Sequence, residues 1–239
     1  MKLQLPDVTL LCADGVNAQR ASNVIEHCKS MCDFGAIKLC THLPVDSEHR
    51  VEIMPLNSLI AYSIWCLTEM HKHIETSHVQ IVQRDGWILN PLSWNNDWLN
   101  YDYIGPLFVQ HDDVGSGGFS MRSKRIMEAA AKRIGDWDGT EDHAQFLQVN
   151  KARSYEDGVL AMTMRYDGLW NYAPPEQAAK FAQGGNKGGK YYEPYPFGYH
   201  GDRQEINHAT GFVSPVCIHG GEDCSCRIEH QNKLMEFEK

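Results

Sequence analysis

The stretch His78-Val-Gln-Ile-Val-Gln-Arg-Asp-Gly-Trp-Ile-Leu-Asn-Pro91 combines an apolar, β-branched run with an abrupt polar stop. The apolar positions between Val79 and Val82 are typical of a buried strand, which we expect to end at Asp85. In an open α/β sheet, ligands bind outside the carboxyl ends of the strands. The Asp85 carboxylate is therefore in position to hold a metal ion, although Asp-Gly is also an ordinary turn pair.

Strand and helix patterns alternate through the residues before and after this stretch. Asn17 and Ser58 are side chains that commonly cap the first turn of a helix. We expect strands at residues 7–14, 36–41, 51–56, 79–82 and 103–105, and helices at residues 17–31, 58–71 and 123–134. This rhythm is typical of an α/β fold with a largely parallel sheet and helices on its faces, and the length of 239 residues suits one such domain.

Two later stretches lack a clear period. Residues 87–91 are expected to form an aromatic-rich loop, and from Tyr166 onward the chain is rich in glycine, proline and tyrosine. A stretch of this composition cannot build a core of its own, so we expect it to wrap over the sheet.

The composition is that of a soluble globular protein, with 42% hydrophobic and 22% charged residues. The sequence shows neither a secretory signal nor a window as long as a membrane helix. Together with cysteines interpreted as reduced thiols, this makes a cytoplasmic protein the expectation. A net charge of −9 weighs against broad, sequence-independent binding of nucleic acid. Five cysteines within apolar patterns are interpreted as reduced core thiols: Cys12, Cys28, Cys32, Cys40 and Cys66.

Two polar motifs follow the central stretch. The glycines near Gly117 and Gly118 allow close approach of the backbone to a ligand, or form a simple tight turn. Their spacing matches neither a Walker A loop nor a dinucleotide fingerprint. Thr140-Glu141-Asp142 is typical of a helix start, and a carboxylate there could also serve as a general base.

Several short blocks of sequence follow one another in a characteristic order. They are LPDVTL at 5–10, AYS at 61–63, VQRDGWILNP at 82–91, YDYIG at 101–105, GGFSMRS at 117–123, ED at 141–142 and FGYHG at 197–201. Their order and spacing resemble those of a poorly characterised family of predicted glycosyltransferases, which is similar to the GT-A class of nucleotide-sugar-dependent transferases. The resemblance runs from residue 5 to about residue 201.

The resemblance implies a GT-A-like, Rossmann-type fold in residues 1–211, with a mixed, mostly parallel sheet and helices on both faces. It implies transfer of a sugar from a nucleotide-sugar donor to a hydroxyl acceptor. The acceptor would be a saccharide or glycolipid, or a modified base in DNA, for which this acidic chain is less suited. A catalytically silent module that binds a nucleotide or glycan on the same fold is the alternative.

The resemblance also assigns roles to residues. Asp85 and His200 resemble a metal-binding aspartate and histidine, with Mn²⁺ or Mg²⁺ as the ion. The common Asp-x-Asp pair is here Gln83-Arg84-Asp85, with a single acid. Asp142, with Glu141 beside it, resembles the acid that deprotonates the acceptor. Residues implied in donor binding are Asp14, Asp85, Gly117, Gly118, Ser120 and Arg122.

Some of these residues have a second interpretation. Arg122 is either a phosphate contact or a buried structural pair. Trp87, Tyr103 and Phe119 could stack on a sugar or a base, although aromatic residues at strand ends are more typical of the core.

The C-terminal segment, residues 212–239, lies outside the resemblance. Thiols and imidazoles gather there, and these groups are ligands of structural Zn²⁺. They are Cys217, His219, Cys224, Cys226 and His230. Cys217, Cys224 and Cys226 would hold the ion, but their spacing departs from the usual paired pattern, and a reduced tail without metal is the alternative.

Overall fold

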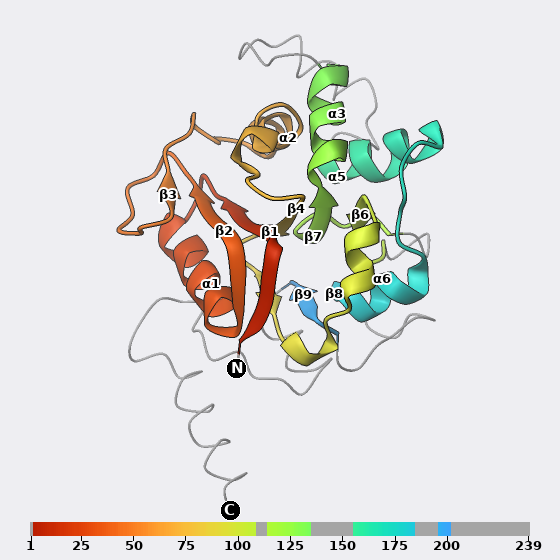
Figure 1. The fold of residues 1–239 in the computed structure, drawn as a ribbon. Helices are drawn as coiled ribbons and strands as arrows, with labels where there is room; N and C mark the ends of the chain where they lie inside the picture. Colours follow the sequence, from red (N-terminus) through yellow and green to blue (C-terminus); the bar gives the residue numbers. More distant parts are fainter. Residues whose placement is uncertain (1, 109–113, 135–154, 185–195, 202–239) are drawn as a thin grey trace, which may run out of the picture.

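The computed structural model describes residues 2–108, 114–134, 155–184 and 196–201. Its central layer is a six-stranded sheet in the order β3-β2-β1-β4-β7-β6 (Figure 1). Four neighbouring strands run parallel, namely β1 (Leu3–Ala13), β2 (Cys32–Cys40), β3 (Arg50–Val51) and β4 (His78–Val82). The other two, β7 (Phe119–Ser123) and β6 (Tyr103–Ile104), make antiparallel pairs. The mixed, mostly parallel sheet of the predicted fold class is confirmed.

Helices cover both faces of this sheet. On one face lies α1 (Ala18–Met31), and on the other lie α2 (Leu59–Thr68), α3 (Lys124–Ile134) and the short α5 (Glu156–Gly158). Successive side chains of a strand point to opposite faces. Leu10 of β1 accordingly packs in the cluster that includes α1, and Leu11 packs in the cluster that includes α2 and α3.

Local capping explains where the long helices begin. The Asn17 side chain accepts the N–H of Arg20, and the Ser58 side chain accepts the N–H of Ala61. Both predicted caps are therefore confirmed. The α2 helix ends at Thr68 and continues only as a 3₁₀ turn, η1 (Met70–His73), so the helix is shorter than predicted.

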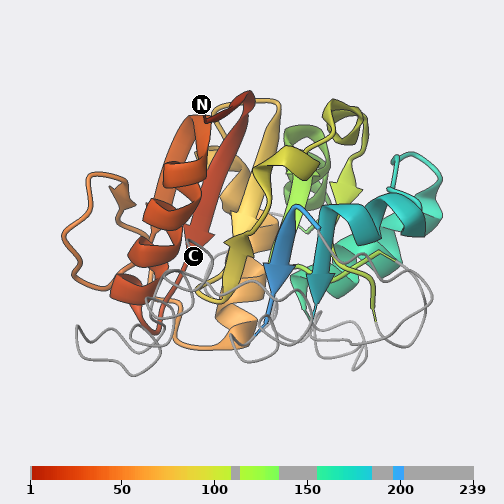
Figure 2. The ribbon, with the colours of Figure 1, turned by 90° about the horizontal axis from the view of Figure 1, so that it is seen from below.

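A second, three-stranded sheet lies beside α1 on the same face of the main sheet (Figure 2). Its order is β5-β9-β8, formed by β5 (Gly86–Ile88), β9 (Gly198–His200) and β8 (Ala182–Gly184). The helix α6 (Pro175–Phe181) leads directly into β8. The prediction of an irregular chain at 87–91 and beyond 166 was therefore wrong for the described residues that form these elements.

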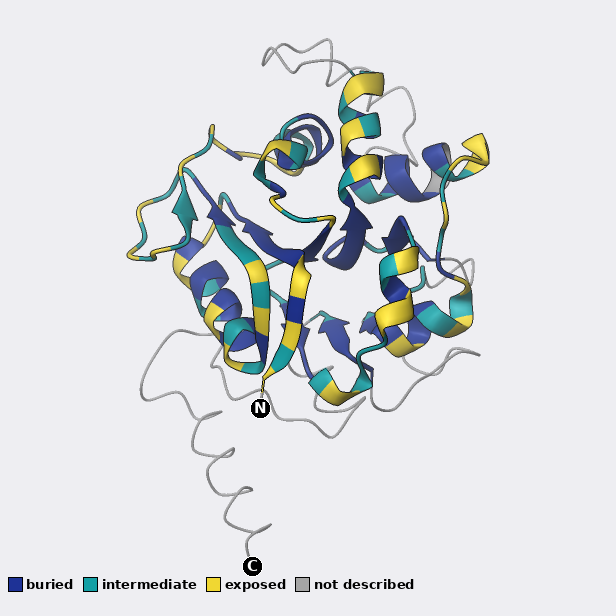
Figure 3. Ribbon diagram, viewed as in Figure 1, coloured by how far each residue is buried: buried dark blue, intermediate teal, exposed yellow. Residues whose placement is uncertain are grey.

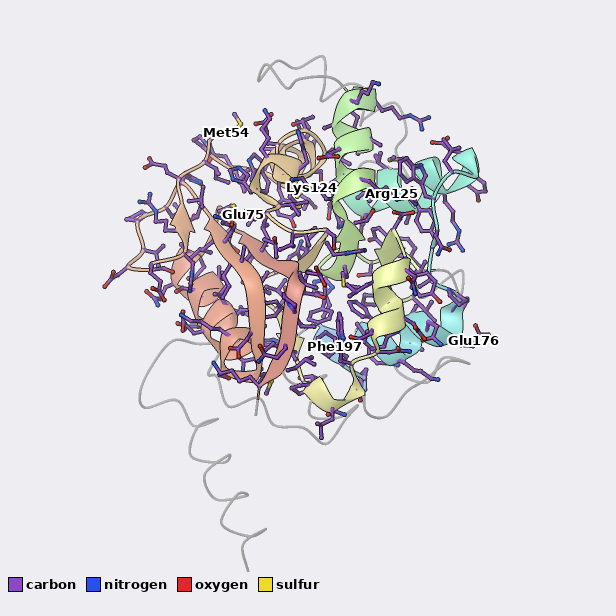
Figure 4. All side chains as sticks on the ribbon, viewed as in Figure 1. Met54, Glu75, Lys124, Arg125, Glu176 and Phe197 are labelled. Carbon is purple, nitrogen blue, oxygen red and sulfur yellow. The ribbon has the colours of Figure 1, made fainter. Side chains whose placement is uncertain are left out.

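Aromatic packing explains why these short strands are stable. Phe197 is fully buried and lies inside the molecule (Figure 4), with ring contacts to Trp94, Trp98, Phe119 and Phe181. Rings of this size bury much apolar area each, which offsets the weak local preference for strand. Further short turns complete the described elements: η2 (Pro91–Ser93), η3 (Asn96–Asn100), η4 (Val159–Thr163) and η5 (Met164–Asp167).

The burial pattern tests several predictions from the sequence. The strands of the main sheet are almost wholly buried near its centre, whereas the helices carry exposed stripes (Figure 3). Trp87, Tyr103 and Phe119 are at most 1% exposed, so the core interpretation of all three is confirmed. The five cysteines predicted as core thiols are buried and free.

Two strands of the main sheet differ from the expectation. The strand predicted at 51–56 is reduced to Arg50–Val51, and the strand β7 was not predicted.

Among the described residues, no helix has the length and apolar character needed to cross a membrane.

Candidate functional site

A cavity of about 450 Å³ lies where β1 and β4 end. Its wall comes from the residues after β1, from the first turn of α2 with the residues before it, and from the turn after β4. The lining residues are 13–16, 56–59, Tyr62, Gln83 and Arg84. This is the edge of the sheet at which open α/β folds bind their ligands.

Asp14 belongs to this wall, but its carboxylate is bonded within the protein. Oδ1 accepts the N–H groups of Val16 and Asn17 at 2.7 and 2.6 Å. Oδ2 accepts a hydrogen bond from Nη1 of Arg84 at 2.9 Å. The Asp14 side chain is 2% exposed and that of Arg84 is 40% exposed. The guanidinium is therefore the charged group of this pair that a ligand can reach.

Asp85 and His200 meet at the same edge, although they are far apart in sequence. Asp85 follows β4 in a turn, and pairing of β5 with β9 sets Gly86 opposite His200. The Asp85 Oδ1 atom lies 3.5 Å from His200 Nε2. Burial opposes ionisation of Asp85, but the hydrogen bond and charge of His200, with the charge of Arg84, outweigh it and lower the pKa of Asp85.

This pair suits a divalent cation. Carboxylate oxygen and imidazole nitrogen are donors that Mn²⁺ accepts, and a site with two protein ligands can be completed by water and phosphate oxygens. Ser116 Oγ lies 3.5 Å from His200 Nδ1, which leaves Nε2 toward Asp85. In the described part of the chain, no cluster of three or more His, Cys, Asp or Glu residues is placed to hold a metal.

The glycine loop, residues 115–118 before β7, connects this pair to the cavity. The backbone N–H of Gln83, a cavity residue, donates to the carbonyl of Gly118 at 2.8 Å. A Cβ atom on Gly118 would collide with the His200 ring, and one on Gly117 would come within 2.6 Å of Glu156 Oε1. Here the missing side chains make room for the protein's own residues.

Beneath the loop, Arg122 and Glu156 form a buried ion pair. Arg122 Nη2 lies 3.2 Å from Glu156 Oε1, and the two side chains are 0% and 4% exposed. Ser120 Oγ accepts the Arg122 Nε–H at 3.1 Å and donates to the Gly117 carbonyl at 2.8 Å. Of the two interpretations of Arg122, the structure therefore agrees with the buried structural pair.

The neighbouring acid, Asp157, has an unusual pKa. Its Oδ2 atom accepts the Gly117 N–H at 3.2 Å, and Oδ1 accepts the Gly158 N–H at 2.8 Å. Burial, then the negative charge of Glu156, raises the pKa of Asp157 from 3.8 to about 6, against the opposing charge of Arg122. A carboxyl group with a pKa raised in this way is a candidate for proton transfer.

The structure thus brings most of the candidate residues to one edge of the sheet. Asp85 and His200 lie on one side of the glycine loop, and Glu156 with Asp157 lies on the other. Glu141 and Asp142 lie outside the described residues, as do all five Cys and His residues of the C-terminal segment.

Glu156 and Asp157 were missed by the reasoning from sequence. The available signal was another Glu-Asp dipeptide, separated by Gly158 alone from the apolar residues 159–161. The sequence does not single out this dipeptide, because Glu-Asp also occurs at 141–142 and 222–223, and its contact with the glycine loop arises only in the folded structure.

Comparison with known proteins gives a family but little functional detail. No curated protein matches the chain. Among solved structures, one similar chain is a glycosyltransferase involved in the glycosylation of the major capsid of PBCV-1. It is 13% identical, with a TM-score of 0.49, and the match covers 86% of this chain and 99% of that one.

The family comparison covers more than half of the chain. The model of a family described as "Protein of unknown function (DUF5672)" matches residues 49–200, which include α2, β4, the glycine loop, Asp157 and His200. The protein therefore belongs to the DUF5672 family.

Proposed function

We propose that this protein transfers a sugar from a nucleotide-sugar donor to a hydroxyl acceptor. One observation carries the proposal: Asp157, with a pKa of about 6, is bonded to Gly117, and the next residue, Gly118, lies against His200. A carboxylate with such a pKa is ionised at neutral pH and is a stronger base than an ordinary one. The glycine loop separates it from a carboxylate–imidazole pair suited to a metal and a phosphate.

The donor fits the cavity at the ends of β1 and β4, with its diphosphate toward Asp85. A divalent ion held by Asp85 and His200 would neutralise charge on the departing diphosphate. The resemblance of residues 82–91, 117–123 and 197–201 to predicted glycosyltransferases supports the same orientation.

In the transfer step, the acceptor oxygen forms a bond to the anomeric carbon of the donor. The bond from that carbon to the phosphate oxygen breaks, and its electron pair leaves with the nucleoside diphosphate. Asp157 takes the proton of the acceptor hydroxyl. This single displacement would invert the configuration at the anomeric carbon. The protein has a net charge of −9, so a saccharide or glycolipid acceptor suits it better than DNA that carries a modified base.

The test is a screen of nucleotide sugars with purified protein and Mn²⁺. We expect one donor to raise the melting temperature and to release nucleoside diphosphate slowly even without an acceptor. Asp157→Asn should bind that donor and fail to turn it over, whereas Asp167→Asn, an acid of the same segment, should behave as the unchanged protein.

Two results would contradict the proposal. If no nucleotide sugar binds or is hydrolysed, the chain is not a nucleotide-sugar transferase. If a donor binds but neither hydrolysis nor transfer follows with any acceptor, the protein is a catalytically silent binding module.

A further inference from the structure

The turn after β4 places a cation at the middle position of the Asp-x-Asp pattern, where Gln83 replaces the first acid. Arg84 immediately precedes Asp85, and its side chain forms part of the cavity wall. Among the described residues that line this cavity, Arg84 is the one with a cationic side chain.

Asp14 holds this guanidinium in place. The buried Asp14 carboxylate is fixed by the N–H groups of Val16 and Asn17, so its Oδ2 atom is a rigid acceptor for Arg84 Nη1. One end of the guanidinium is thereby anchored, and within the described residues its other N–H groups have no hydrogen-bond partner that would compete with a ligand. A planar guanidinium that is already oriented loses less conformational entropy when it binds two oxygens together.

The charges around the cavity favour an anionic partner at Arg84. The Asp14 side chain is only 2% exposed, and two backbone N–H groups offset its negative charge. Asp85 adds a second negative charge nearby, but it faces His200. A ligand that enters the cavity therefore meets the positive side of the Arg84–Asp14 pair.

We infer that Arg84 binds the diphosphate of the donor directly, and that the protein consequently binds a diphosphate even without a divalent metal. Asp14 is then a positioning residue, which orients Arg84 and does not itself contact the nucleoside. This inference rests on the proposed function. It assigns to an arginine part of the neutralisation of leaving-group charge that a metal ion held by two acids would otherwise supply.

The test measures binding of inorganic pyrophosphate and of uridine and guanosine diphosphates by calorimetry, in EDTA and then with Mn²⁺. In EDTA, the unchanged protein should bind pyrophosphate, and Arg84→Gln should weaken that binding by about tenfold or more. Arg133→Gln is the matched control, because Arg133 is also a half-exposed arginine paired with one acid, Asp167. Its affinity should not change.

In Arg84→Gln, the buried Asp14 carboxylate loses the cation that pairs with it. The melting temperature of this variant therefore shows whether it still folds. If it does not fold, the double variant Asp14→Asn with Arg84→Gln removes both charges together. That variant should fold and should also lose the binding measured in EDTA.

The outcomes separate this inference from the proposed function. If the unchanged protein binds these ligands only with Mn²⁺, or if the folded variant binds pyrophosphate in EDTA as well as the unchanged protein does, Arg84 has no direct role and the inference is overturned. The proposed function would still stand in either case. If no diphosphate and no nucleotide sugar binds under any condition, both fail.

Discussion

The backbone N–H of Gly117 donates a hydrogen bond to the Asp157 carboxylate, with 3.2 Å between the nitrogen and Oδ2. This contact joins the segment that carries the acidic pair to the loop that packs against His200. This hydrogen bond ties the candidate base directly to the rest of the site.

Asp157→Asn should abolish transfer and preserve the fold. The amide keeps the size of the side chain and one acceptor oxygen, but it cannot take a proton from a hydroxyl. We expect the turnover rate to fall by roughly a hundredfold or more, with donor affinity near that of the unchanged protein. Transfer rates and donor dissociation constants, measured on both proteins, check this. If the variant keeps its turnover rate, Asp157 is not the base.

The pH dependence of stability should also identify Asp157. Its pKa in the folded protein, about 6, lies above the ordinary value of 3.8, so the fold favours the neutral form. That contribution to stability is fully present below the ordinary pKa and is lost as pH rises through about 6. The free energy of unfolding of the unchanged protein should therefore fall relative to that of Asp157→Asn between about pH 4 and 7. A difference that is constant over this range would contradict the assigned pKa.

Breaking the buried ion pair of Arg122 and Glu156 should be costly. Glu156→Gln leaves the fully buried guanidinium without its counter-charge, which typically destabilises a protein by roughly 3–5 kcal/mol. The double variant Arg122→Met with Glu156→Leu should recover much of this loss, because no charge stays buried. Denaturant unfolding measures both. As a control, Asp167→Asn breaks the more exposed pair with Arg133 and should cost no more than about 1 kcal/mol.

Gly118→Ala should destabilise the protein through a collision with His200. The new Cβ would occupy space that the imidazole ring fills, and overpacking of this kind costs on the order of 1–3 kcal/mol. In a His200→Ala background the same substitution should cost much less, since the ring is absent. A double-mutant cycle on unfolding free energies reports the coupling. Equal costs in the two backgrounds would show that the loop moves freely away from His200.

Metal binding should depend on both members of the Asp85–His200 pair. With a nucleoside diphosphate present, Mn²⁺ should raise the melting temperature of the unchanged protein, because a ligand that binds only the native state stabilises it. Asp85→Ala and His200→Ala should each remove this effect of Mn²⁺. Asp46→Ala, which changes an exposed acid outside the candidate site, is the control. A full Mn²⁺ effect in either site variant would refute the shared site.

The sequence by itself determined the elements whose signals are local. The side chains that start α1 and α2, Asn17 and Ser58, bond to N–H groups three residues further on, so each helix start is encoded by adjacent residues. The buried strand β4 was equally readable, because a β-branched apolar run needs no particular partner to be recognised. The position of Asp85 at the end of that strand followed directly.

Only the tertiary structure decided the rest of the site. The three-residue strands β5, β8 and β9 pair with one another, and β5 lies more than a hundred residues before its partner β9. No local pattern marks such short partners. The same pairing set His200 beside Asp85. Two properties of Asp157 arise only when distant segments pack together. They are its hydrogen bond from Gly117 and its raised pKa, which burial and the charge of Glu156 cause.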